Sequence, residues 1–116
     1  MNIFEFSQLL ATQARSSKPY LEFLRVSALS VGVYVLEAGA SDHQKPHSED
    51  EVYYVVSGRA RMSVDEPGGI KSFAVGPGKL LYVQAGVRHS FHQITEKLVV
   101  LVFFAPPEGT LGATKS

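Results

Sequence analysis

Three side chains in this sequence are suited to holding a metal ion: His47, Glu51 and His89. Imidazole nitrogen and carboxylate oxygen together are suitable ligands for divalent Zn, Fe, Mn or Ni. Three protein ligands leave coordination positions open, which allows an ion to activate a small molecule instead of only supporting the structure. The residue types therefore predict a divalent-metal site and leave the identity of the metal open.

The predicted elements place these side chains at strand ends. Glu51 begins the strongest predicted strand, 51–56, where period-two alternation puts it on the same face as Tyr53. If that face points inward, the carboxylate enters an apolar interior, where an unpaired charge is costly and a cation offsets the cost. His89 follows the turn at 84–86 and begins another strand, so it can point inward from across the barrel.

The rest of the chain predicts short strands separated by turns. The glycine and proline clusters at 65–69 and 76–79 are typical of such turns. No helix is predicted between the strands, so a sandwich or barrel is expected instead of a parallel sheet. The expected strands, about eight in number, are 20–26, 29–36, 51–56, 59–64, 70–75, 80–83, 88–94 and 97–104.

The strand at 97–104 lacks polar and apolar alternation, so both of its faces should be buried. One cover for its outer face is a short N-terminal helix, which the helical spacing of Ile3, Phe6 and Leu9 predicts before Pro19. The other is a homodimer interface. Of the two, the sequence favours the homodimer.

Bulk properties restrict the protein class. The 116 residues suit a single domain, 1–116, with a core at about 20–106. Eleven basic residues balance eleven acidic ones, which disfavours nucleic acid and membrane surfaces as partners. There is no cysteine, and no basic region precedes an apolar stretch as in a signal peptide, so a cytoplasmic protein is expected. Residues 108–116 are expected to fray.

Two segments, 39–58 and 78–93, resemble the two conserved motifs of the cupin superfamily. The first motif is matched by Gly39, His47, Glu51 and Gly58, and the second by Gly78, Gly86 and His89. Gln84 and Gln93 stand where the second motif has proline and asparagine. The resemblance implies an all-β double-stranded β-helix, or jelly-roll barrel. It also implies a metal held by three histidines and one glutamate, with His47, Glu51 and His89 among the ligands.

The first histidine position of the motif is occupied by Lys45. A protonated lysine has no lone pair to donate, so it is not an ordinary ligand. His43 has the same extended-chain parity as Lys45 and would restore the imidazole. Gln44 offers a neutral oxygen, and similar Gln-x-Pro-His segments occur in small bacterial cupins. Both His43 and Gln44 remain candidates for the fourth ligand.

A small-molecule pocket is expected inside the barrel, because ligand pockets are mostly apolar with a few polar groups. Glu49 and Asp50 are interpreted as a solvated acidic rim. The residues expected to line the pocket are Tyr53, Met62, Tyr82 and Phe91.

Two functions of different classes follow from the resemblance. One is a metal-dependent enzyme of dioxygenase, isomerase or decarboxylase type that acts on a small molecule. The other is a non-catalytic module that binds a small molecule or a metal, which the departures at Lys45, Gln84 and Gln93 motivate. Fold alone does not choose between them.

Overall fold

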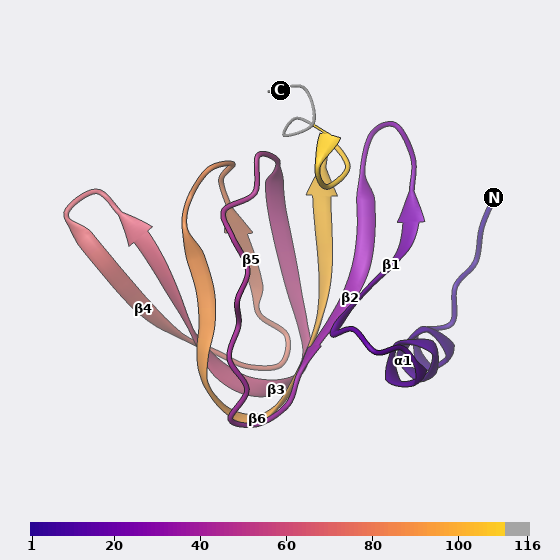
Figure 1. Ribbon diagram of the computed structural model, residues 1–116, viewed down its shortest axis with the longest axis horizontal. Coiled ribbons are helices and arrows are strands. Elements are labelled where there is room, and N and C mark those ends of the chain that lie inside the picture. The colour runs from indigo at the N-terminus through magenta and orange to yellow at the C-terminus, as the bar shows by residue number, and fades with distance from the viewer. Residues whose placement is uncertain (111–116) are drawn as a thin grey trace.

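Two long strands, β3 (Asp50–Glu66) and β6 (His89–Ala105), organise the molecule and pair antiparallel from end to end. The computed structural model describes residues 1–110 (Figure 1). Within that range no helix is long and apolar enough to cross a membrane. The other elements are α1 (Phe6–Arg15), β1 (Tyr20–Arg25), β2 (Ser30–Leu36), β4 (Gly69–Val75) and β5 (Leu80–Val83).

Both long strands bend into a U, so that their two halves form opposite walls of the barrel (Figure 1). The pairing of β3 with β6 shifts register around Gly58. Gly58 has a φ of +95°, and a Cβ there would overlap the carbonyl oxygen of Lys97. Only glycine accommodates this bend.

The bend corrects the expected strand count. The predicted strands 51–56 and 59–64 are the two halves of β3, and 88–94 and 97–104 are the two halves of β6. Six strands therefore replace the expected eight in the described part of the chain. Gly58 lies between the two strands predicted at 51–56 and 59–64, and in the structure it bends one continuous strand.

The strands form one sheet in the order β1-β2-β6-β3-β4, with β5 paired to the first half of β3. β4 pairs with the second half of β3 and projects as a hairpin from one side of the molecule (Figure 1). Large apolar side chains fill the interior near the bends. They include Val55, Met62, Phe91, Ile94, Leu98 and Val100.

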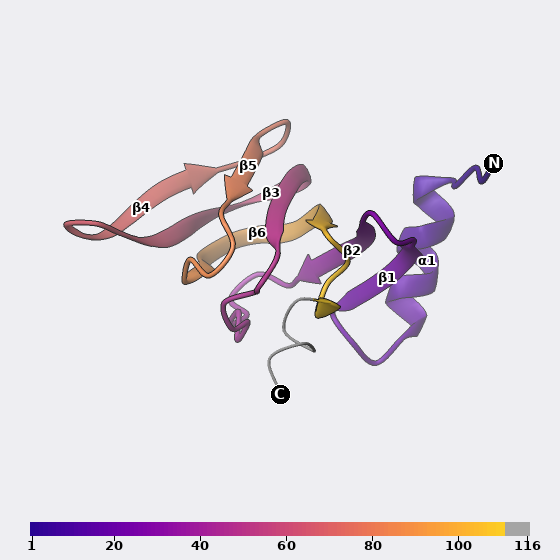
Figure 2. The ribbon, with the colours of Figure 1, turned by 90° about the horizontal axis from the view of Figure 1, so that it is seen from above.

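Helix α1 lies outside the barrel against the face formed by β1, β2 and β6 (Figure 2). Its side chains Phe6, Leu9 and Leu10 pack against a second apolar cluster that contains Val33 and Val99. The N-terminal helix therefore supplies one of the two covers expected for the final strand. The homodimer stays a prediction.

Candidate functional site

A cavity of about 310 Å³ lies at the open end of the barrel, opposite the bends. This volume is at the lower end of the roughly 300–1,000 Å³ typical of small-molecule sites. Its aromatic wall includes Tyr20, Tyr34, Tyr53 and Phe104. Its polar groups include Gln44, His47, Glu51 and Glu108. The cavity thus combines an apolar wall with a few polar atoms, as ligand sites commonly do.

Glu51 and His89 meet across the barrel interior. Their side chains are 2% and 1% exposed, and Glu51 Oε1 lies 2.9 Å from His89 Nε2. Glu51 is the second residue of β3, while His89 begins β6 after a turn in which Gly86 has a φ of +82°. The two sequence-predicted residues are therefore side by side, although they belong to opposite walls.

The hydrogen bonds of His89 define its orientation. Its Nδ1 lies 2.9 Å from the carbonyl oxygen of Val87, which can only accept, so Nδ1 carries a proton. Nε2 lies 3.0 Å from the Tyr53 hydroxyl and points into the interior. Burial lowers the pKa of His89, but the contacts with Glu51 and the Val87 carbonyl outweigh burial and raise the pKa above its usual value. Nε2 is therefore the ring nitrogen that faces Glu51 and Tyr53, while His89 itself is not among the residues that line the 310 Å³ cavity.

Two buried oxygens next to the cavity lack hydrogen-bond partners among the described residues: Glu51 Oε1 and the Tyr20 hydroxyl. The short contact of Glu51 Oε1 with His89 joins opposite charges, but it is not directed as a hydrogen bond. A buried polar atom without a partner costs roughly 1–3 kcal/mol, and more for a charged group. Both residues line the cavity, so a bound ion or ligand would offset this cost.

Gln44 is held with its amide oxygen toward the site. Its Nε2 donates to Asp42 Oδ2 at 2.6 Å, while its Oε1 accepts from the Tyr53 hydroxyl at 3.0 Å. Asp42 also accepts from the Tyr34 hydroxyl at 2.6 Å and from the backbone N–H of Phe91 at 2.8 Å. Because Asp42 accepts from the amide nitrogen, the amide cannot flip without losing that hydrogen bond.

Lys45, which occupies the first-histidine position, and the two candidates beside it differ in placement. Gln44 is half-buried and lines the cavity. His43 is exposed and is not part of the lining. Lys45 also lines the cavity, with its residue exposed to solvent. Gln44 is therefore closer to the expected role than His43 in this arrangement.

His47 forms another part of the cavity wall. Its ring packs edge-to-face on Phe104 at 4.7 Å between centroids and lies 6.3 Å from the ring of His89. Its Nδ1 is 3.5 Å from Glu108 Oε2. Within residues 1–110, no three histidine, aspartate or glutamate side chains are gathered into a metal-binding group. The Glu51–His89 pair is in contact, and His47 stands apart from it.

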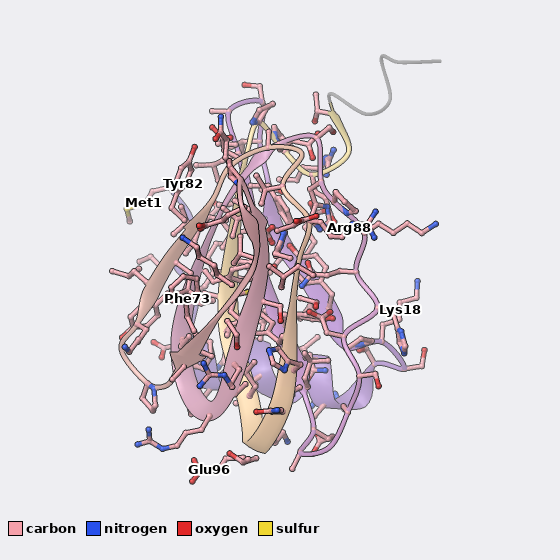
Figure 3. The ribbon with its side chains drawn as sticks, turned by 90° about the vertical axis from the view of Figure 1, so that its left-hand side faces the viewer. Met1, Lys18, Phe73, Tyr82, Arg88 and Glu96 are labelled. Carbon is pink, nitrogen blue, oxygen red and sulfur yellow. The ribbon has the colours of Figure 1, made fainter. Side chains whose placement is uncertain are left out.

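The residues expected to line the pocket occupy three different positions. Tyr53 lines the cavity, whereas Met62 and Phe91 are buried in the apolar interior. Tyr82 is 65% exposed and points outward from β5 (Figure 3). Alternation explains this position, since Tyr82 pairs with Val52 on the outer face, while its neighbours pair with the inward residues of β3.

Several residues of the site were not identified from sequence. Glu49 is 2% exposed, which corrects its interpretation as a solvated rim, and its Oε1 accepts from the Gly109 N–H at 3.0 Å. Residues 108–110 of the expected frayed tail are hydrogen-bonded and Glu108 lines the cavity, while residues 111–116 lie outside the described part of the chain. The other residues missed are Tyr20, Tyr34 and Asp42. In the sequence, the only indication of such a role was that Asp42 directly precedes His43 and Gln44, the two candidates for the fourth ligand.

Burial alters the acidity of several of these groups. It is the main cause that raises the pKa of Glu108 above its usual value, while the nearby His47 acts in the opposite direction. Burial likewise raises the pKa values of the Tyr34 and Tyr53 hydroxyls. These tyrosines therefore stay protonated at neutral pH, as their donated hydrogen bonds to Asp42 and Gln44 require.

An antiparallel barrel with a cavity lined by histidine and glutamate at one end is the architecture of a small cupin. The family model for the cupin domain matches residues 32–104, and the chain belongs to this family. A relative in Streptomyces coelicolor, the uncharacterized protein SCO3923, is 50% identical over 108 residues, which cover 93% of this chain and 99% of the relative.

Solved structures show the same fold. An rmlc-like cupin family protein with a double-stranded β-helix fold from Methanocaldococcus jannaschii is 16% identical, with a TM-score of 0.68 over 91% of each chain. The structure of Fe(II)-HppE with an alternative substrate is 16% identical, with a TM-score of 0.62. That match covers 73% of this chain and 48% of HppE. The predicted all-β cupin barrel is thus confirmed.

Proposed function

We propose that this cupin binds a divalent metal ion at the open end of the barrel and uses it to hold a small molecule in the cavity. Glu51 Oε1 is the single observation that carries the proposal, because it is a buried carboxylate oxygen that accepts no hydrogen bond among the described residues. A cation next to it would offset the cost of burying this charge.

The proposed ligands are Glu51, His89, His47 and the amide oxygen of Gln44. Nδ1 of His89 is already engaged by the backbone, so Nε2 is the nitrogen left for an ion. Replacing a proton on Nε2 by a metal keeps a positive charge beside Glu51, which the contact at 2.9 Å favours. The oxygen of Gln44 is oriented by Asp42 and lies next to Tyr53. These donors suit Fe, Mn, Ni or Zn.

A bound divalent ion would polarise an oxygen of a ligand or lower the pKa of a bound water. The residues of the chain itself supply the surroundings for that chemistry. Tyr34 and Phe104 form part of the aromatic wall of the cavity, and the Tyr53 hydroxyl holds Gln44 in place. HppE contains iron(II) in the structure that resembles this fold, which supports the choice of a metal as cofactor.

The metal proposal is tested by metal analysis of protein purified without chelator, followed by calorimetric titration of the metal-free protein with Fe(II), Mn(II), Ni(II) and Zn(II). We expect one ion per chain in the wild type, and loss of stoichiometric binding in Glu51→Ala and His89→Ala while circular dichroism shows a folded barrel. Glu96→Ala is the matched control because Glu96 is exposed and lies at the bend end of the molecule (Figure 3). Full occupancy in either site variant would exclude the assignment.

Two functions are compatible with a bound metal. The first is an enzyme of dioxygenase, isomerase or decarboxylase type, which is tested by anaerobic reconstitution and a screen of small oxygenated and aromatic compounds. Turnover above that of the free ion is expected. The second is a non-catalytic binding module, which is favoured by Lys45 at the first-ligand position and by the distance of His47 from the Glu51–His89 pair. Ligand binding without turnover would support it.

A further inference from the structure

Glu108 lies in the turn after β6, and hydrogen bonds with three separate parts of the chain hold the backbone of this turn in place. The Glu108 N–H donates to Ser30 Oγ at 3.0 Å, and Arg25 donates to the Glu108 carbonyl at 2.9 Å. The next N–H, that of Gly109, donates to the buried carboxylate of Glu49. Ser30 is itself fully buried. The position of Glu108 is therefore set by β1, β2 and the loop before β3.

This anchored backbone directs the Glu108 side chain into the cavity wall. Its Oε2 lies 3.5 Å from Nδ1 of His47, and the two side chains are 34% and 20% exposed. The separation is that of an ion pair, about half an ångström longer than a directed N–H···O hydrogen bond. The carboxylate of Glu108 therefore lies beside Nδ1 of the His47 ring, and Nε2 is on the opposite edge of the ring.

We propose that Glu108 is a positioning residue that accepts the Nδ1 proton of His47 and so presents Nε2 of that ring to the metal. The inference rests on the proposed function. A histidine ligand usually donates its second ring N–H to a carboxylate or a carbonyl, which fixes the tautomer and the ring orientation. His89 Nδ1 is hydrogen-bonded to the backbone carbonyl of Val87, and the group nearest to Nδ1 of His47 is the Glu108 carboxylate at 3.5 Å, which would take this role once the contact shortens.

The arrangement has a consequence for metal affinity. His47 is the candidate ligand that stands apart from the Glu51–His89 pair, so its binding depends on how its ring is held. Partners of this kind change metal affinity by roughly 10–100-fold when they are removed. The contribution of the C-terminal turn is therefore measurable without any knowledge of the substrate.

The test titrates metal-free protein with Co(II) and follows affinity and the visible absorption spectrum in four proteins: wild type, Glu108→Ala, Glu108→Gln and the control Glu96→Ala. We expect Glu108→Ala to lose about 10–100-fold in affinity and to change the absorption spectrum. Glu108→Gln should lose less, since its amide oxygen can still accept from Nδ1. Glu96→Ala should match the wild type.

The outcomes separate the inference from the metal proposal. If the wild type binds Co(II) and Glu108→Ala binds it equally well with an unchanged spectrum, Glu108 has no positioning role while the metal site stands. If the wild type binds none of the ions, the metal proposal fails and the inference falls with it. Thermal unfolding of each metal-free variant identifies a loss of fold. If Glu108→Ala unfolds, Glu108→Gln decides: weakened binding supports the inference and wild-type binding overturns it.

Discussion

The open end and the bend end of the barrel are built from the same two strands, but their interiors differ. At the bend end, Val55 and Leu98 are fully buried among other apolar side chains. At the open end, Glu51 and His89 are equally buried, yet Glu51 Oε1 accepts no hydrogen bond within the described part of the chain. One end is packed for stability, and the other retains polar atoms that a bound ion or ligand would satisfy.

If the proposed metal site is correct, the folding energy and the binding capacity of the molecule lie in different parts of one sheet. Burial of apolar surface stabilises the bend end, whereas burial of polar groups without full partners costs stability at the open end. Substitutions at the two ends should therefore have different signatures. Substitutions at the bend end should lower the free energy of unfolding, and substitutions at the open end should lower the affinity for the metal.

The largest effect on stability is expected from Leu98→Ala, because Leu98 is completely buried at the bend end. The lost contacts and the remaining cavity should lower the free energy of unfolding by about 2–5 kcal/mol. Urea denaturation measures this change. Metal affinity of the folded variant should stay at the wild-type value, and a large loss of affinity would break the proposed separation between the two ends.

The next effect is expected at the open end, where Gln44→Ala removes an amide oxygen oriented by Asp42. Metal affinity should fall at least about tenfold, which corresponds to roughly 1.4 kcal/mol. His43→Ala is the matched neighbour, since His43 is exposed, and it should bind as the wild type does. The reverse result in calorimetry would identify His43 as the fourth ligand.

A smaller effect is expected from Leu9→Ala, on the side of α1 that faces the sheet. Leu9 is half-buried and packs with Leu10 against the outer apolar cluster. Partial loss of this burial should lower the free energy of unfolding by about 1 kcal/mol, measured by urea denaturation. Gln8→Ala, on an exposed position of the same helix, is the control and should be neutral. Equal effects of the two substitutions would contradict packing of the helix through its apolar side.

The smallest effect on stability is expected from Tyr82→Ser, because Tyr82 is largely exposed on the outer face of β5. The change in free energy of unfolding should stay within about 0.5 kcal/mol. Leu80 and Phe103 are also exposed on the outside of the sheet. If these residues form the expected homodimer interface, sedimentation velocity should show a dimer that Tyr82→Ser weakens. A monomeric wild type would disprove the homodimer prediction.

Local patterns in the sequence predicted a sandwich or a barrel, and the resemblance to the two cupin motifs selected the barrel. Strand residues alternate, and the glycines and prolines at 65–69 and 76–79 mark turns, so the eight predicted segments fall on the six observed strands. The continuity of β3 could not be predicted, because Gly58 has the same local appearance in a turn and in a bend. The inward face of β5 was also not determined, since four residues are too few to fix which side alternates inward.

The candidate site depended on contacts between distant parts of the chain. Asp42 and the backbone of Phe91 are 49 residues apart, and Glu49 and Gly109 are 60 apart. Loops have no periodicity from which such pairs could be predicted. For this reason the sequence could not decide between His43 and Gln44 as the fourth ligand, and it did not identify Glu108. Glu51 and His89 were identified as candidates because their positions at strand ends are local features.

The long pairing of β3 with β6 also has a kinetic consequence. Tyr53 and His89 are 36 residues apart, and the strand ends Asp50 and Ala105 are partners. Folds dominated by such non-local pairs generally form in milliseconds to seconds, because distant segments must meet before their contacts stabilise them. Glu51 and His89 come into contact only when this pairing is complete. In a refolding experiment, acquisition of a metal by this pair would therefore mark the end of barrel formation and not its nucleation.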